Sequence, residues 1–206
     1  MDDPLTGGAA AAAAPAADQG RALARRLAAL VAGSEPLLGP VRLVCIDGPA
    51  GSGKTTFAAL LGAELGAQVV HVDDLLAGWG DLEGVWPRLR DGLLAPLGAG
   101  LTGRYRRYDW VAQEFAEVHE VPVAEVLVLE GCGSARRGVD PCAVLKVWVE
   151  APPAERLARG IARDGEAMRA HWLAWAQDEA AHFAAEGTRE RADVIVDSGV
   201  GAALEP

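Results

Sequence analysis

The sequence predicts an α/β fold in which helices cover both faces of a parallel sheet. Five short apolar runs rich in β-branched residues lie along the 206-residue chain and alternate with helix-forming stretches. A glycine-rich turn follows the first run directly and leads into a helical stretch. Strands that alternate with helices favour parallel pairing, because each connection crosses a face of the sheet. With no internal repeat or linker, we expect one domain over residues 18–206, preceded by a poorly ordered tail over residues 1–17.

The expected strands cover residues 41–46, 68–72, 126–129, 144–149 and 193–196. The expected helices cover residues 18–33, 56–65, 85–97 and 152–186. Asp18 is a favoured N-cap and Gly33 a favoured helix end, whereas Gly165 is expected to break the last helix. The stretch 75–122 is the least regular part of the chain, because prolines and glycines interrupt it, and within it residues 104–110 are expected to be extended.

Residues 48–55 match the phosphate-binding pattern G-x-x-x-x-G-K-[ST] in full, between a predicted strand and a predicted helix. In such a turn, backbone N–H groups converge on phosphates and the helix dipole adds partial positive charge. Lys54 is expected to reach the β- and γ-phosphates of a nucleoside triphosphate, and the Thr55 hydroxyl to bind Mg²⁺. We therefore expect ATP and Mg²⁺ as cofactors. The expected nucleotide-binding residues are Gly48, Ala50, Gly51, Ser52, Gly53, Lys54, Thr55 and Thr56.

The composition of the chain argues against nucleic acid and anionic membranes as binding partners. The net charge of −10 provides no electrostatic footprint for nucleic acid or for an anionic membrane. Phosphate binding must therefore come from the loop and a few arginines. Three cysteines without metal-ligand spacing suggest reduced thiols in a cytoplasmic protein. No apolar stretch approaches the length of a membrane span, and the acidic amino terminus lacks the pattern of a signal peptide.

Two predicted strands end in acidic residues, Asp73-Asp74 and Glu130. The carboxyl ends of parallel strands line the ligand crevice, so these acids are expected near the phosphate loop. A carboxylate there can accept the proton of an attacking hydroxyl, or hold Mg²⁺ or its water. The alternatives are a helix cap for the pair and an exposed strand end for Glu130. We assign capping to Asp74, and chemistry and a metal contact to Asp73.

Three arginines, Arg156, Arg159 and Arg163, follow one another at spacings of three and four. This spacing places them on one face of a helix, where they could clamp the phosphates during transfer. The alternative is a solvated basic face paired with Glu155 and Asp164, which is the usual meaning of such a charge run.

The motifs together resemble those of uridine kinase-like proteins, a group that includes uridine/cytidine kinases and nicotinamide riboside kinases. The resemblance covers roughly residues 41–197 and is carried, in order, by residues 46–56, 70–74, 129–131 and 156–164. It implies a P-loop kinase-type three-layer sandwich with a five-stranded parallel sheet in the order 2-3-1-4-5. The sequence departs from the family pattern after the lid, because Arg163-Asp164 runs into Gly165 and only Arg169 lies beyond.

The resemblance also implies roles for single residues. Asp73 would be the general base toward the acceptor hydroxyl, with Thr55 and Glu130 near Mg²⁺. Arg159 and Arg163 would belong to a mobile lid and act, with Lys54, on the transferring group.

The acceptor is expected to meet the segment 104–110, which reads Arg-Tyr-Arg-Arg-Tyr-Asp-Trp. Arginines interleaved with aromatic residues could stack a base and pair with sugar hydroxyls or a phosphate. The family places a Tyr-Asp pair in a comparable hairpin. The candidates are therefore Arg104, Arg107, Tyr108 and Asp109, with Trp79 as a further candidate for the pocket wall. The alternative is an exposed amphipathic strand whose aromatic rings pack on the core, as we expect for Trp172 and Trp175.

These patterns lead to the hypothesis of a kinase that transfers the γ-phosphoryl group of ATP to a hydroxyl of a nucleoside-like acceptor. One alternative is a nucleoside monophosphate kinase, in which Arg104 or Arg107 grips an acceptor phosphate. Others are a regulatory ATPase and a degenerate fold that binds nucleotide without chemistry. The identity of the acceptor, the choice between ATP and GTP and the oligomeric state stay open.

Overall fold

A five-stranded parallel sheet forms the centre of the molecule. The computed structural model describes residues 7–199, with side chains from residue 18 onward. The strands of the sheet are β1 (Arg42–Asp47), β2 (Gln68–His71), β5 (Val126–Glu130), β6 (Ala143–Glu150) and β7 (Val194–Asp197). Their order is β2-β5-β1-β6-β7, which is 2-3-1-4-5 when only these five are numbered. The predicted class and strand order are confirmed.

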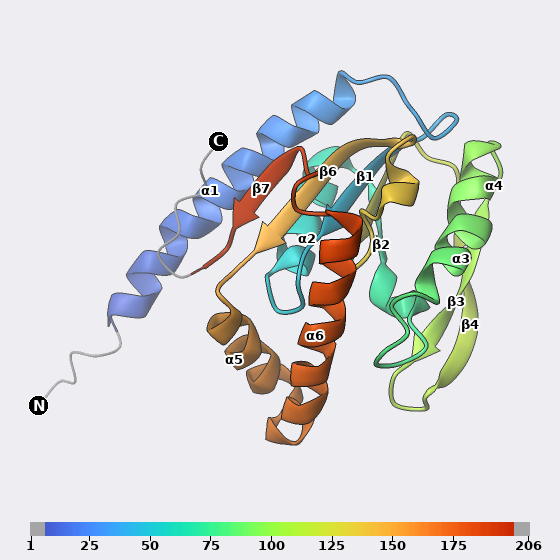
Figure 1. The fold of residues 1–206 in the computed structure, drawn as a ribbon. Coiled ribbons are helices and arrows are strands. Elements are labelled where there is room, and N and C mark those ends of the chain that lie inside the picture. Colours follow the sequence, from blue (N-terminus) through green and yellow to red (C-terminus); the bar gives the residue numbers. More distant parts are fainter. Residues whose placement is uncertain (1–6, 200–206) are drawn as a thin grey trace, which may run out of the picture.

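Helices cover both faces of this sheet (Figure 1). On one face, α1 (Gly7–Ala32) and α2 (Lys54–Leu65) pack through Leu27 and Leu61 against Val44 and Ile46 of β1. Alternate residues of the same strand, such as Leu43, enter a second core cluster on the other face. This alternation follows from the period of two along a strand. The three-layer sandwich is thus built on apolar side chains of both faces.

The second face is covered by a helical segment and by α6 (Arg169–Glu186). The segment consists of α3 (Val85–Leu89), a π-helical turn η2 (Arg90–Leu94) and α4 (Ala95–Gly98). The prediction of a helix over residues 85–97 is therefore confirmed, with a π turn in its middle. Trp175 of α6 lies in the same core cluster, as expected for a core residue.

A separate antiparallel hairpin follows, formed by β3 (Gly103–Asp109) and β4 (Glu114–Val121). The sequence predicts the first strand but not the second. The reason is that β4 buries only Val121 fully and therefore shows no clear alternation of apolar and polar residues. In Figure 1 the hairpin lies beside α3 and α4 at one end of the molecule.

The last helical stretch divides as expected. Helix α5 (Pro153–Asp164) ends at Gly165, whose φ of +92° suits glycine, and a 3₁₀ turn (Glu166–Met168) leads into α6. Two further 3₁₀ turns are η1 (Val72–Leu75) and η3 (Arg137–Val139).

The amino-terminal helix differs from the expectation. Helix α1 begins at Gly7, so Asp18 lies within the helix and does not start it. The expected tail over residues 1–17 stays a prediction, since residues 1–6 lie outside the described part and no side chain of 7–17 is described. Among the described residues, no helix combines the length and the apolar character that a membrane crossing requires.

Candidate active site

The phosphate loop joins the end of β1 to the start of α2. Gly48, Gly51 and Gly53 have φ values of +140°, +77° and +92°. A Cβ atom on Gly48 would lie 2.1 Å from the carbonyl oxygen of Val149, and one on Gly51 would lie 2.5 Å from that of Arg156. The loop therefore needs glycine at these positions both for its backbone angles and for space.

Asp47, the last residue of β1, anchors this loop. Its buried carboxylate accepts N–H groups of Gly48 (2.7 Å), Gly133 (3.0 Å) and Ala135 (2.8 Å). Burial raises the pKa of Asp47, although the backbone N–H donors act against that shift. Asp47 thus ties the phosphate loop to the segment that follows β5. Asp47 is not among the predicted site residues, although an acid at a strand end directly before the loop is a visible signal in the sequence.

Lys54 lies inside the loop with its ammonium turned inward. Its Nζ donates to the carbonyl oxygen of Pro49 (3.1 Å) and lies 3.7 Å from Sγ of Cys132. Burial by itself lowers the pKa of Lys54, but Cys132, Glu130 and the other acidic groups around it outweigh burial and raise the pKa. The lysine is therefore a buried cation close to carboxylates, and its contact with phosphates stays a prediction.

Thr55 and Glu130 meet across the sheet edge, as predicted. The Thr55 hydroxyl donates to Oε1 of Glu130 (3.1 Å), and Nδ1 of His71 lies 2.6 Å from Oε2 of the same carboxylate. His71 and Glu130 are register partners because β2 and β5 are neighbours. The hydrogen bond to Glu130 raises the pKa of His71. Glu130 is buried, so the exposed strand end is excluded, and His71 is a site residue that the sequence analysis missed.

Asp73 lies in the 3₁₀ turn after β2, on the same side of the sheet. The residue is exposed to solvent, yet the protein groups around its carboxyl still desolvate it in part. This desolvation raises the pKa of Asp73, while Lys54 and Arg163 act to lower it. The expected capping role of Asp74 is wrong, because Asp74 lies inside the turn that begins at Val72, and its carboxylate instead accepts the Tyr105 hydroxyl (3.3 Å).

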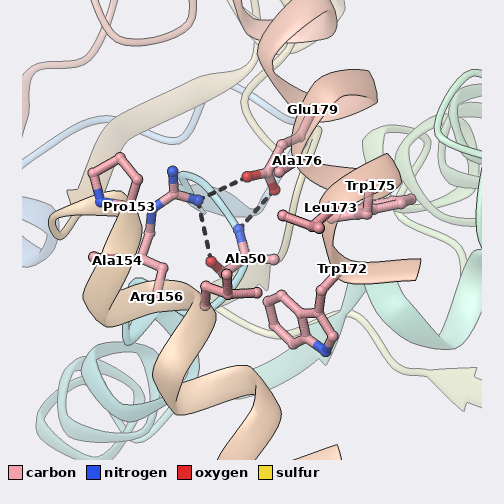
Figure 2. Close-up of a pocket in the computed structure, with 10 residues that line it drawn as sticks. Ala50, Pro153, Ala154, Arg156, Trp172, Leu173, Trp175, Ala176 and Glu179 are labelled. Atoms are coloured by element: carbon pink, nitrogen blue, oxygen red, sulfur yellow. Dashed lines mark hydrogen bonds and ion pairs between the residues drawn. The ribbon is translucent and has the colours of Figure 1, made fainter. Parts of the chain in front are cut away.

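The three arginines of α5 have different partners. Arg156 reaches Ala50 and the buried Glu179 of α6 (Figure 2). Arg159 donates to the carbonyl oxygens of Gly51 (3.2 Å) and Ser198 (2.8 Å) and pairs with Glu155.

Arg163 pairs with Asp164, lies over the ring of Trp172 and interacts electrostatically with Asp73. Arg163 therefore acts on the Asp73 carboxyl through charge alone, since its guanidinium is hydrogen-bonded to Asp164. The ion pairs of Arg159 with Glu155 and of Arg163 with Asp164 are those expected if the arginines form a solvated basic face, so that alternative holds in part.

The other predicted loop residues differ in accessibility. Ser52 is fully buried, and its carbonyl accepts the hydroxyl of Ser198. Thr56 is exposed on the first turn of α2. The N–H of Ala50 donates to Oε2 of Glu179 (2.7 Å), so this group is already engaged inside the protein.

The four acceptor candidates of the hairpin are all held by protein groups. Arg104 pairs with Glu120 (2.8 Å) and Arg107 with Glu117 (2.6 Å). Asp109 accepts the N–H groups of Val111 and Ala112 (both 2.9 Å) and so closes the hairpin turn. Tyr108 is buried against the rings of Trp110 and Phe115. Their part in acceptor binding stays a prediction.

Trp79 connects the acid-bearing turn with the hairpin and with α6. Its ring stacks on His171 (5.8 Å between centroids) and meets Trp110, Trp172 and Trp175 edge-on. The Trp110 indole N–H donates to the carbonyl oxygen of Asp73 (3.2 Å), and its side chain is partly exposed. An aromatic wall therefore borders the turn that carries Asp73.

The donor atoms fit Mg²⁺. Thr55 and Glu130 offer hard oxygen ligands beside the loop, as this cation prefers. Among the side chains that the structure describes, no group of three or more His, Cys, Asp or Glu residues could hold a metal ion. A magnesium ion that takes its remaining ligands from phosphates and water needs no such group.

The strand order, the loop between β1 and α2, and the acids at the ends of β2 and β5 define a P-loop kinase fold. Solved structures that share it include the following two. One is a possible uridine kinase from Bacillus stearothermophilus, with TM-score 0.59 and 20% identity over 86% of this chain and 97% of that one. The other is a proposed fructose transport system kinase from Silicibacter sp. TM1040, with TM-score 0.59 and 23% identity over 84% of this chain and 98% of that one. No protein-family model and no curated protein matches the sequence.

Proposed function

We propose that this protein is an ATP- and Mg²⁺-dependent small-molecule kinase that transfers the γ-phosphoryl group to a hydroxyl of a nucleoside-like acceptor. One observation carries the proposal. Thr55 of the phosphate loop donates to Glu130 at 3.1 Å, and the neighbouring Lys54 interacts electrostatically with Glu130 and Asp73, so the loop and the two acids belong to one site. That combination is what phosphoryl transfer needs, since it is achieved mainly by positioning and electrostatic stabilisation.

In the proposed reaction, Lys54 and the loop hold the β- and γ-phosphates. The acceptor oxygen attacks the γ-phosphorus while the bond to the β,γ-bridging oxygen breaks, and Asp73 takes the hydroxyl proton. The raised pKa of Asp73 makes it a better proton acceptor than an ordinary aspartate. Arg163, which also interacts electrostatically with Asp73, would offset charge on the transferring group. Mg²⁺ held by Thr55 and Glu130 would neutralise charge on the β- and γ-oxygens.

The contacts of the hairpin favour a hydroxyl acceptor over an acceptor phosphate. Arg104 and Arg107, the residues that would grip a monophosphate, are neutralised by Glu120 and Glu117. The partly exposed Trp110 beside Asp73 suits a planar ring instead. The fold shared with a possible uridine kinase is consistent with a nucleoside-like acceptor. As part of the proposal we place the protein in the cytoplasm, where its three free thiols would stay reduced.

The test is a turnover assay with ATP and Mg²⁺ against a panel of nucleosides and their monophosphates. A thermal-shift screen with a non-hydrolysable ATP analogue selects the panel, because a bound acceptor stabilises the folded protein by mass action. We expect ADP formation to rise steeply with a nucleoside. Hydrolysis that runs equally fast without any acceptor would favour the ATPase alternative.

A further inference from the structure

The peptide of Ala50 in the phosphate loop is held from outside the loop by two side chains. Oε2 of Glu179 accepts the Ala50 N–H at 2.7 Å, and Nη1 of Arg156 donates to the Ala50 carbonyl oxygen at 3.3 Å. Arg156 also donates to Oε1 of Glu179 at 2.8 Å, which closes the arrangement shown in Figure 2. The two side chains come from α5 and α6, which are 106 and 129 positions from Ala50 in the sequence.

The hydrogen bonds of Glu179 and Arg156 to Ala50 form a clamp on the loop, and the surroundings of this clamp make it rigid. The side chain of Glu179 is 2% exposed and that of Arg156 is 16% exposed. The pair borders a cavity of about 220 Å³ whose walls include Leu157, Trp172 and Trp175. In apolar surroundings charge-assisted hydrogen bonds are strengthened, and a partner left alone is costly. The conformation of the loop at Ala50 is therefore imposed by α5 and α6.

We propose that Glu179, supported by Arg156, is a positioning residue that presets the phosphate loop for the nucleotide. The inference rests on the proposed function only in taking a nucleotide as the ligand of the loop. Glu179 acts through Ala50. Because the Ala50 N–H is already bonded to the Glu179 carboxylate, Glu179 contributes to nucleotide binding by fixing the shape of the loop. Arg156 has a second task, because it neutralises a carboxylate that would otherwise repel the phosphates.

Two substitutions separate positioning from simple electrostatics. Glu179→Met keeps the approximate volume but removes the acceptor for the Ala50 N–H. Glu179→Gln removes the charge and replaces one carboxylate oxygen by an NH2 group, but its remaining oxygen can still accept the Ala50 N–H. If the charge alone mattered, both changes would alter nucleotide affinity alike. Positioning predicts a large loss for the methionine variant and retention of most affinity by the glutamine variant. Asp178→Asn, an exposed neighbour on the same helix, is the matched control.

The experiment is calorimetric titration of the full chain with a non-hydrolysable ATP analogue and Mg²⁺, without an acceptor. We expect Glu179→Met to raise the Kd at least about tenfold, or about 1.4 kcal/mol. Glu179→Gln should stay within about threefold, and Asp178→Asn should match the wild type. In turnover assays, the KM for ATP should rise in the methionine variant while the KM for the acceptor stays constant. Hydrogen exchange of the loop around Ala50 should also become faster.

Each outcome decides the inference. A folded Glu179→Met variant with wild-type affinity and wild-type exchange in the loop overturns it. If that variant does not fold, Glu179→Met combined with Arg156→Met removes the unpaired charge and carries the same expectation. A wild type that binds nucleotide but transfers no phosphoryl group refutes the proposed reaction alone, and the titration still tests the clamp. A wild type that binds no nucleotide refutes both.

Discussion

Asp73→Asn is the substitution that most directly tests the proposed chemistry. The asparagine side chain has nearly the same shape but cannot take a proton from the acceptor hydroxyl. The loss of a general base typically lowers the rate about 10²- to 10⁴-fold. We expect the loss to fall within that range, since Asp73 interacts electrostatically with Lys54 of the phosphate loop.

The same substitution should leave the affinity for ATP unchanged or slightly higher. Asp73 carries negative charge close to Lys54, and removing it relieves repulsion of the triphosphate. The assay measures kcat with the best acceptor and, separately, binding of a non-hydrolysable ATP analogue. Asp74→Asn is the control, since that carboxylate binds the Tyr105 hydroxyl and should affect kcat little. A kcat for Asp73→Asn within a few-fold of the wild type would refute the assignment of the base.

The raised pKa of Asp73 further predicts a wild-type kcat that falls with acidification already above the ordinary aspartate range of about 4, as a pH–rate profile would show. Glu130→Gln should raise the Mg²⁺ concentration required for half-maximal turnover, measured by metal titration. The reason is that it replaces one carboxylate oxygen of the proposed Mg²⁺ ligands, Thr55 and Glu130, by an amide nitrogen. The pKa of His71 is raised by Glu130, so its stabilising contribution is complete below about pH 6.5 and is lost as the pH rises through the folded-state value. Denaturant unfolding from pH 5 to 9 should show this loss in the wild type and not in His71→Gln. Gly51→Ala should abolish binding of the ATP analogue in titration calorimetry, because the new Cβ atom would lie 2.5 Å from the Arg156 carbonyl oxygen at a φ of +77°.

Much of the fold could be predicted because its signals are local. Strand β5 is buried along its whole length, and its apolar run ends in Glu130 at the sheet edge where the prediction placed it. Strand β4 lacked such a signal, since a two-stranded hairpin with little burial has no apolar face to mark it. The start of α1 was misjudged because Asp18, a good N-cap in isolation, lies inside a longer helix.

The site was predictable where a contiguous motif or a strand end marks it. The phosphate loop is contiguous in the sequence and contains Thr55, and the rule on strand ends placed Glu130 near it. The role of His71 depends on the register between β2 and β5, which no local pattern reveals. Helical spacing placed Arg156 and Arg163 on one face, yet their contacts depend on what α6 presents to each of them.

The aromatic cluster around Trp79 has an optical consequence. Four of the six tryptophans, Trp79, Trp110, Trp172 and Trp175, belong to this cluster, with ring centroids no more than 6.2 Å from that of Trp79. Indoles at this separation share excitation energy, so their emission depends on how the hairpin, the turn after β2 and α6 lie relative to one another. The chain thus contains its own spectroscopic probe. The wavelength and quantum yield of its tryptophan fluorescence should report the approach of an acceptor without any added dye.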